Sequence, residues 1–132
     1  MTQSASVLIV EDNYLLLEML SSLCEQQGIR VFAASSGEDA LTMLRQRASE
    51  IDWLFTDISL PGLIDGWEVA AAYREQNPRR PVIYASTAPH IARRTVPGSI
   101  FVHKPFQVRE IISLAKMMVL AEGEESLLSA AG

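Results

Sequence analysis

The sequence predicts an α/β domain in which helices cover both faces of one five-stranded parallel sheet. Five short apolar runs rich in Val, Ile and Phe recur along the chain, and segments with helical spacing separate them. The runs do not alternate apolar with polar residues, which is typical of parallel strands buried on both faces. Because each parallel return requires a right-handed helical crossover, three layers are expected. Five such units suit the doubly wound strand order 2-1-3-4-5, which is taken from known domains of this class.

The predicted strands are residues 7–10, 29–33, 53–55, 82–85 and 100–102. Between the first two strands, Asp12 and Asn13 precede leucines at helical spacing, and Gly28 closes that helix. Two further helices begin at sequences that resemble capping boxes, the first in a weakened form. These are Ser36 with Asp39 and Asp65 with Glu68. The last helix carries one buried stripe, formed by Val108, Ile111, Ile112, Ala115 and Val119.

The segment between the fourth and fifth strands, residues 88–99, contains Pro89, Pro97 and Gly98, so a shortened fourth helix is expected. Residues 122–132 are acidic and small and lack periodicity, which predicts a flexible tail. A chain of 132 residues with 48% hydrophobic content is long enough for one core and too short for two comfortable ones. We therefore predict one domain over residues 1–132, with its core at about 5–121.

Composition excludes several classes of function. A net charge of -5 argues against a surface that binds nucleic acid through many Lys and Arg contacts. Cys24 is the one cysteine, which excludes a disulfide framework and suits a reducing compartment; it is expected to fill the core. Neither a charged-then-apolar leader nor an apolar run long enough to cross a bilayer is present. A cytoplasmic protein without membrane contact is expected.

Polar and charged residues follow the ends of four predicted strands. Glu11 and Asp12 follow the first strand and Asp57 the third, where ligands bind in open α/β sheets. Ser86 and Thr87 follow the fourth strand, and His103 and Lys104 the fifth. Three acids brought together repel one another, so the cluster needs a cation. Oxygen ligands of this kind, with phosphate nearby, suit Mg²⁺, and the mixture of carboxylate, metal and Lys suits phosphoryl transfer.

From about residue 5 to residue 121 the chain resembles a response-regulator receiver domain of two-component signalling. The matching segments are VLIVEDN at 7–13, DISLPG at 57–62, DGWE at 65–68, PVIYAS at 81–86 and HKPF at 103–106. Each is weak alone, but their order and spacing on the strand ends make the combination highly specific. The resemblance implies the flavodoxin-like strand order, and its stand-alone, single-domain type is expected.

The resemblance also implies roles for individual residues. Asp57 matches the phosphorylated aspartate, Asp12 the acid that binds Mg²⁺ directly, and Glu11 an acid that acts through water. The backbone carbonyl of Ser59 would be a further metal ligand, and Lys104, before a usually cis proline, would pair with the phosphoryl group. The remaining matches are Ser86 as the hydroxyl that turns onto the phosphate, with Thr87 as the alternative, and Phe101 as the aromatic switch residue.

The implied function is a protein switch. A histidine kinase or histidine phosphotransfer protein would phosphorylate Asp57, and the altered surface would bind a downstream protein target, with a homodimer left open. Positions 59 and 88, here Ser59 and Ala88, influence hydrolysis of phospho-aspartate in this family. Neither offers a strong base or an amide to orient water, so slow self-dephosphorylation is expected. Classical enzyme activity is not expected.

Three other functions fit the sequence less well. A haloacid-dehalogenase-like phosphatase also uses an aspartate nucleophile with Mg²⁺, but it carries a second acid two residues on, where this chain has Ser59. A flavin or nucleotide binder would place a Ser, Thr or Gly-rich loop after the first strand, where this chain has Glu11, Asp12 and Asn13. A degenerate receiver acting as a constitutive adaptor conflicts with retention of the reactive residues.

Each candidate also has a structural explanation when taken alone. Glu11 and Asp12 could cap the first helix and interact favourably with its dipole, and Asp57 could form a turn after its strand. Lys104 alone would be a solvated charge, and Phe101 alone a core residue. The two histidines, His90 and His103, lack metal-ligand spacing and are treated as ordinary. The functional interpretation therefore depends on the combination.

Overall fold

Five parallel strands form one sheet, and their order across it, numbered along the chain, is 2-1-3-4-5, as predicted. The computed structural model describes residues 5–87 and 95–117. The strands are β1 (Ser6–Val10), β2 (Arg30–Ala34), β3 (Trp53–Asp57), β4 (Val82–Ser86) and β5 (Ile100–His103). The helices are α1 (Tyr14–Gln26), α2 (Gly37–Arg47) and α3 (Gly66–Gln76), with a 3-10 turn η1 (Ala48–Glu50) and a C-terminal helical segment at 108–117.

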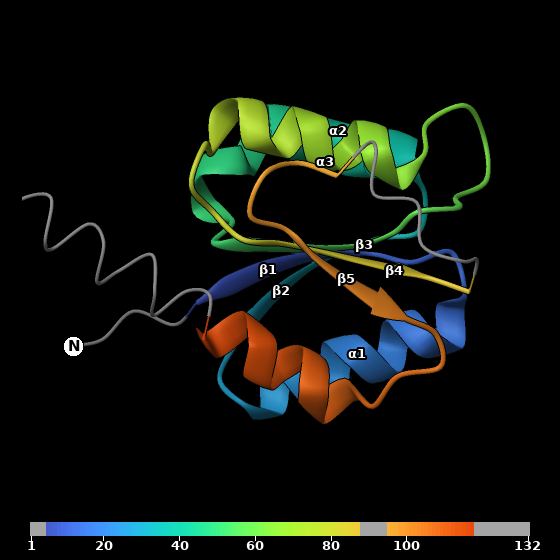
Figure 1. The fold of residues 1–132 in the computed structure, drawn as a ribbon, viewed down its shortest axis with the longest axis vertical. Coiled ribbons are helices and arrows are strands. Elements are labelled where there is room, and N and C mark those ends of the chain that lie inside the picture. The colour runs from blue at the N-terminus through green and yellow to red at the C-terminus, as the bar shows by residue number, and fades with distance from the viewer. Residues whose placement is uncertain (1–4, 88–94, 118–132) are drawn as a thin grey trace, which may run out of the picture.

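Helices cover both faces of the sheet, which gives the predicted three layers. Figure 1 shows α2 and α3 on one face, and α1 with the helical segment 108–117 on the other. Successive strand residues point to opposite faces, so each strand supplies both cores. In β1, for example, Leu8 and Val10 join the core under α2 and α3, whereas Val7 and Ile9 join the core over α1. The predicted core position of Cys24 is confirmed on the α1 side.

The helix starts follow the sequence signals. Asn13 caps α1 by accepting a hydrogen bond from the Leu16 N–H at 3.1 Å, so Asn13 rather than Asp12 is the capping residue. The predicted caps of α2 and α3 are also present, at Ser36 Oγ and Asp65 Oδ1. Gly28 ends α1 with a φ of +78°, the left-handed conformation that glycine adopts without steric cost.

The strand ends meet at one edge because the strands are parallel and in register. Val10 pairs with Thr56, Asp57 with Ala85, and Ser86 with His103. The residues that follow β1, β3, β4 and β5 therefore lie together, on the right-hand side of Figure 1. Residues 58–65, the β3–α3 loop, rise from the same edge.

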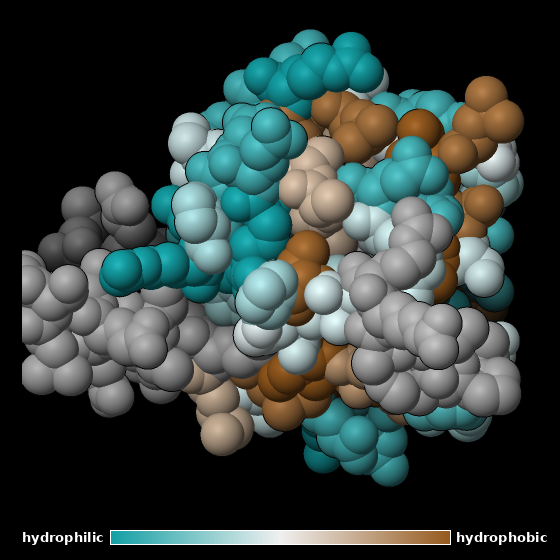
Figure 2. Space-filling model, turned by 45° about the horizontal axis from the view of Figure 1, so that its top comes forward, coloured by the Kyte–Doolittle hydropathy of each residue, from teal (hydrophilic) through white to brown (hydrophobic). Residues whose placement is uncertain are grey.

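Some predictions fall on parts that the structure does not describe. The shortened fourth helix was expected within 88–99, of which 88–94 lie outside the described residues; residues 95–99 are not helical. Ala88, His90, Val119 and the tail at 122–132 also lie outside. Within the described residues, no helix combines the length and apolar character that a membrane crossing requires. Figure 2 shows hydrophobic side chains reaching a mostly hydrophilic surface, several of them on the side where Figure 1 places the β3–α3 loop.

Candidate functional site

Three carboxyl groups converge at the ends of β1 and β3. Glu11 and Asp12 follow β1, and Asp57 ends β3 on the neighbouring strand. One oxygen from each of the three lies within 4.8 Å of the others. Glu11 and Asp57 are buried, whereas Asp12 is exposed. The cluster therefore has a buried floor and one acid open to solvent.

Lys104 supplies the positive charge that faces these acids. Its Nζ lies 2.8 Å from Glu11 Oε1 and 2.6 Å from Asp57 Oδ1. The Lys104 N–H also donates to the Ser86 carbonyl at 2.8 Å, which continues the pairing of β4 with β5 and places Lys104 at the strand ends. The peptide bond from Lys104 to Pro105 is cis, as the resemblance implies.

Glu11 is held on both carboxylate oxygens by this chain. Oε1 accepts from Lys104 Nζ, and Oε2 accepts from the Asn13 backbone N–H at 3.1 Å. Asp57 is different: its Oδ1 is buried and has an ion-pair contact with Lys104 without hydrogen-bond geometry. This oxygen has no hydrogen bond to lose, so it can bind a metal ion or accept a hydrogen bond at little cost in free energy.

The pKa values of the cluster diverge. Burial raises the pKa of Asp57 to about 8, and a hydrogen bond shared with Glu11 adds to the rise while Lys104 opposes it. Burial also acts to raise the pKa of Glu11, but its hydrogen bonds with Asp57, Lys104 and the Asn13 N–H outweigh burial and leave it lowered. For Lys104, burial is outweighed by the two acids, and its pKa is raised. In the absence of metal, burial thus favours the protonated form of Asp57, whereas the ionised form of Glu11 is favoured beside the Lys104 ammonium group.

A small hollow of about 130 Å³ opens beside these groups. It is lined by Asp12, Asp57, Ser59, Ala85, Ser86, Thr87 and Lys104. Ser86, at the end of β4, is buried, whereas Thr87 is exposed. The hollow therefore brings together carboxylates, hydroxyls and one ammonium group.

The chain matches the family model of the response regulator receiver domain over residues 7–116, which is most of its length. The chain belongs to this family. It is 34% identical to a response regulator receiver protein of known structure from Sinorhizobium medicae, with a TM-score of 0.83 and coverage of 91% of this chain and 98% of that one. Receiver domains are signalling proteins that interact with histidine kinases or phosphotransfer proteins, and they bind Mg²⁺ at an acidic pocket.

Two relatives of this receiver domain carry names of regulators. It is 27% identical to the probable transcriptional regulatory protein TcrX of Mycobacterium tuberculosis, over 98% of this chain and 56% of that protein. It is 29% identical to the response regulator SaeR of Staphylococcus aureus, over 80% of this chain and 46% of that protein. The chain thus spans about half the length of these curated relatives.

The residues of this receiver domain fit a divalent ion. The three acids and Lys104 would carry a net charge of -2 if all were ionised, and every carboxylate here is a hard oxygen ligand. The buried Asp57 Oδ1 that lacks a hydrogen bond faces the same cluster. A divalent ion would neutralise the excess negative charge and would bind to this Asp57 oxygen.

Seven residues that the sequence singled out for the site come together. Glu11, Asp12, Asp57 and Lys104 form the cluster, and Ser59, Ser86 and Thr87 line the hollow. Phe101 does not line the hollow; it is half-buried, opposite Tyr84 in the sheet, and packs on the core under α2 and α3. His103 is exposed and contacts the Lys104 carbonyl through its ring.

Sequence reasoning missed Gly66, the first residue of α3. A Cβ at this position would lie 1.9 Å from the Asp57 carbonyl oxygen, so only glycine lets α3 start against the end of β3. Its N–H also donates to the Ile58 carbonyl at 2.8 Å. The glycine after the capping Asp65 was a visible signal, but its closeness to Asp57 depends on the folded chain.

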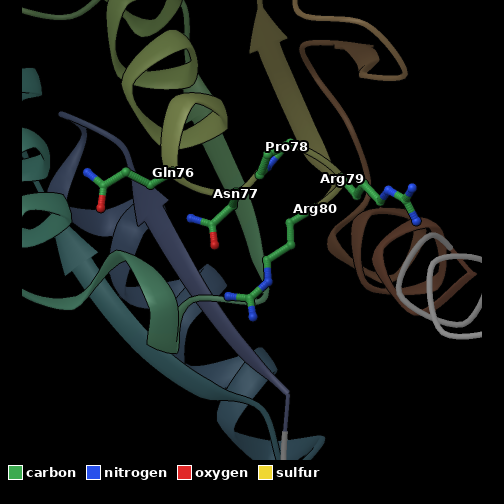
Figure 3. Close-up of a pocket in the computed structure, with 5 residues that line it drawn as sticks. All are labelled: Gln76, Asn77, Pro78, Arg79 and Arg80. Carbon is green, nitrogen blue, oxygen red and sulfur yellow. The ribbon is translucent and has the colours of Figure 1, made fainter. Parts of the chain in front are cut away.

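A larger hollow, of about 390 Å³, lies at the other end of the sheet before β4. Figure 3 shows the five residues that line it, from Gln76 to Arg80. The Arg80 guanidinium donates to the carbonyls of Ser49 and Ile51, and the Asn77 amide donates to those of Ala48 and Tyr73. These hydrogen bonds join η1 to the end of α3. We therefore interpret the residues around this hollow as structural, and the hollow lies at the opposite end of the sheet from the acidic cluster.

Proposed function

We propose that Asp57 accepts a phosphoryl group from a histidine kinase or a histidine phosphotransfer protein, with Mg²⁺ present. One observation carries this proposal: the Asp57 carboxylate lies 2.6 Å from Lys104 Nζ and within reach of Asp12, beside a hollow with hydroxyl groups. A nucleophile, a cation and a metal-ligand set within one hollow are what phosphoryl transfer needs.

In the proposed step, a carboxylate oxygen of Asp57 bonds to phosphorus and forms an acyl phosphate. The bond from phosphorus to the donor imidazole nitrogen breaks, and that nitrogen keeps the electron pair and takes up a proton from water. The Lys104 ammonium would neutralise charge on the phosphoryl oxygens throughout the transfer. Because burial raises the pKa of Asp57 to about 8 without metal, its carboxyl group must lose its proton before it attacks phosphorus.

Asp12, Asp57 and the backbone carbonyl of Ser59 would hold the Mg²⁺ ion directly, and Glu11 would act through water. The protein contacts on both Glu11 oxygens support the indirect role, since they leave Asp12 and Asp57 better able to bind. The bound ion would supply charge neutralisation for the transferring phosphoryl group.

Ser86 is proposed as the hydroxyl that turns onto the phosphoryl group, with Thr87 as the alternative, because both line the hollow. New charge-assisted hydrogen bonds from Ser86 and Lys104 would favour an active arrangement by a few kcal/mol, enough to shift its population substantially. Phe101, on the strand next to Ser86, would follow this change as the switch residue. The altered surface would bind a downstream protein target, in the cytoplasm.

Phosphorylation of Asp57→Asn and wild-type protein by acetyl phosphate tests this function. Wild type should be labelled in Mg²⁺ but not in excess EDTA, and Asp57→Asn should not be labelled in either. Asp39→Asn, an exposed acid in the first turn of α2, is the matched control and should behave as wild type. Full labelling of Asp57→Asn would overturn the site assignment. An unlabelled wild type that still binds its partner would instead favour a constitutive adaptor.

A further inference from the structure

The β3–α3 loop is fastened at its tip by the side chain of a residue on α2. The Leu63 backbone N–H donates to Glu38 Oε2 at 3.1 Å, across 25 residues of sequence. Glu38 lies in the first turn of α2 and is exposed. Leu63 itself is 91% exposed, so its own side chain does little to hold the loop.

The backbone of this loop is shaped around the Glu38 carboxylate. Gly62 has a φ of +86°, which other residues rarely adopt. A Cβ at Gly62 would lie 2.5 Å from Glu38 Oε2. The carboxylate therefore lies directly over Gly62 while it accepts from Leu63.

The start of α2 also contacts the returning half of the loop. A Cβ at Gly37 would lie 2.5 Å from the Ile64 carbonyl oxygen and 2.7 Å from Ile64 Cβ, so the helix backbone lies directly against the loop. Gly37 and Glu38 together thus bring α2 against three consecutive loop residues, Gly62, Leu63 and Ile64.

The base of the loop is closed by the sheet. The Ile58 N–H donates to the Ala85 carbonyl at 3.0 Å, and the Gly66 N–H donates to the Ile58 carbonyl at 2.8 Å. Ser59, whose carbonyl is the proposed metal ligand, lies between this closed base and the tip that Glu38 holds. The orientation of the Ser59 peptide group therefore depends on the loop at both ends.

We propose that Glu38 is a positioning residue for the Mg²⁺ site: its carboxylate holds the tip of the β3–α3 loop and so keeps Ser59, the proposed backbone ligand, in place beside the hollow. This inference rests on the proposed function. Loss of the carboxylate would free the tip, and the metal would have to order the loop when it binds. The exposed position of Glu38 means that its removal should not disturb the core.

Three variants separate positioning from charge. Glu38→Ala removes the hydrogen-bond acceptor, and Glu38→Gln keeps an acceptor oxygen without the charge. Asp39→Ala removes the same charge from the next residue of α2, which is also exposed. If Glu38 acts by holding the loop, only Glu38→Ala should bind Mg²⁺ more weakly. If Glu38 acts only through its negative charge, all three variants should bind Mg²⁺ more weakly by a similar factor.

Two measurements read the effect. Amide hydrogen exchange of metal-free protein should show faster exchange at Leu63 in Glu38→Ala, by roughly tenfold, and near wild-type exchange in Glu38→Gln. Calorimetric titration with Mg²⁺ should show a Kd that is about threefold to tenfold higher in Glu38→Ala than in wild type. Loss of a group that orients a metal ligand usually weakens metal binding by about tenfold or more, so this effect lies at the low end of that range or below it. Glu38→Gln and Asp39→Ala should stay within about twofold of wild type.

Gly62→Ala gives an independent check. Its Cβ would collide with the Glu38 carboxylate, so Gly62→Ala should weaken Mg²⁺ binding more in the wild-type background than in Glu38→Ala. Additive effects would overturn the proposal, as would an unchanged Kd or Leu63 exchange rate in Glu38→Ala, provided that wild type binds Mg²⁺. If wild type bound no Mg²⁺ at all, the proposed function itself would fail.

Discussion

Lys104 reaches Asp57 across the end of the strand that separates them. Asp57 ends β3 and Lys104 follows β5, with β4 between the two, yet Nζ lies 2.6 Å from Asp57 Oδ1. The same nitrogen lies 2.8 Å from Glu11, which follows β1, the strand on the other side of β3 from β4. One side chain therefore joins the ends of β1, β3 and β5, and any change in the charge of Asp57 acts on it directly.

Lys104→Ala should still be labelled at Asp57 by acetyl phosphate, because the nucleophile and the metal ligands remain. Labelling should not switch the protein, because the cation that contacts the phosphoryl group would be lost. Partner binding or self-association, measured with and without beryllofluoride, would report the switch. Lys116→Ala is the control, since Lys116 is exposed and hydrogen-bonds to the Gln27 side chain just after α1. A beryllofluoride response of wild-type size in Lys104→Ala would contradict this prediction.

Stability without metal should fall as the pH rises. The pKa of Asp57 is raised from 3.8 to about 8 by folding, so the native state holds a proton that the unfolded chain has lost. A raised carboxyl pKa favours the native state below it, and this advantage declines as pH increases toward about 8. Urea unfolding in EDTA at about pH 6 and about pH 8 should show a larger loss for wild type than for Asp57→Asn, which has no carboxyl group to titrate there.

Mg²⁺ should reduce this pH dependence, because it competes with the proton on Asp57. Its affinity should therefore rise with pH up to about 8, where Asp57 is ionised without metal. Equal pH dependence in wild type and Asp57→Asn would show that the pKa of Asp57 is not raised in the native state.

Gly66→Ala should destabilise the protein by about 2–4 kcal/mol, because its Cβ would collide with the Asp57 carbonyl. Gly28→Ala is a useful contrast: it has a positive φ, but a Cβ there meets nothing within 4 Å. Its cost should stay at about 1–2 kcal/mol, from backbone strain alone. Denaturant unfolding of both variants separates the effect of the steric clash from that of backbone strain. Similar losses of stability in the two variants would contradict the clash with the Asp57 carbonyl.

Tyr84→Phe should cost about 1 kcal/mol of stability, because the Val96 N–H donates to the Tyr84 hydroxyl at 3.0 Å and would lose its acceptor. Tyr14→Phe is the matched control, since Tyr14 is 74% exposed. Thermal unfolding measures both. An unchanged Tyr84→Phe would mean that water replaces the hydroxyl at no cost.

Phospho-Asp57 should hydrolyse slowly, because Ser59 and Ala88 offer no strong base or amide to orient an attacking water. Acid-quenched time points of labelled protein would measure the rate in Mg²⁺. Complete loss within seconds would refute the expectation.

Apolar runs, capping residues and strand-end acids were enough to predict the parallel sheet, its layers and the acidic cluster. This succeeded because parallel strands in register must bring the residues after them to one edge, wherever these residues lie in the chain. Asp12, Asp57 and Lys104 could therefore be grouped from the sequence alone. The strand order was taken from known domains, and the sheet has that order.

Only the tertiary structure decided how the grouped side chains divide their contacts. Lys104 lies on the buried Glu11 and Asp57 and leaves Asp12 exposed, and Asn13 rather than Asp12 caps α1. The contact of Glu38 with Leu63 and the closeness of Gly66 to Asp57 were likewise invisible in the sequence. The physical reason is that periodicity specifies which face and which edge a residue occupies, whereas ångström-scale distances depend on how separate elements pack together.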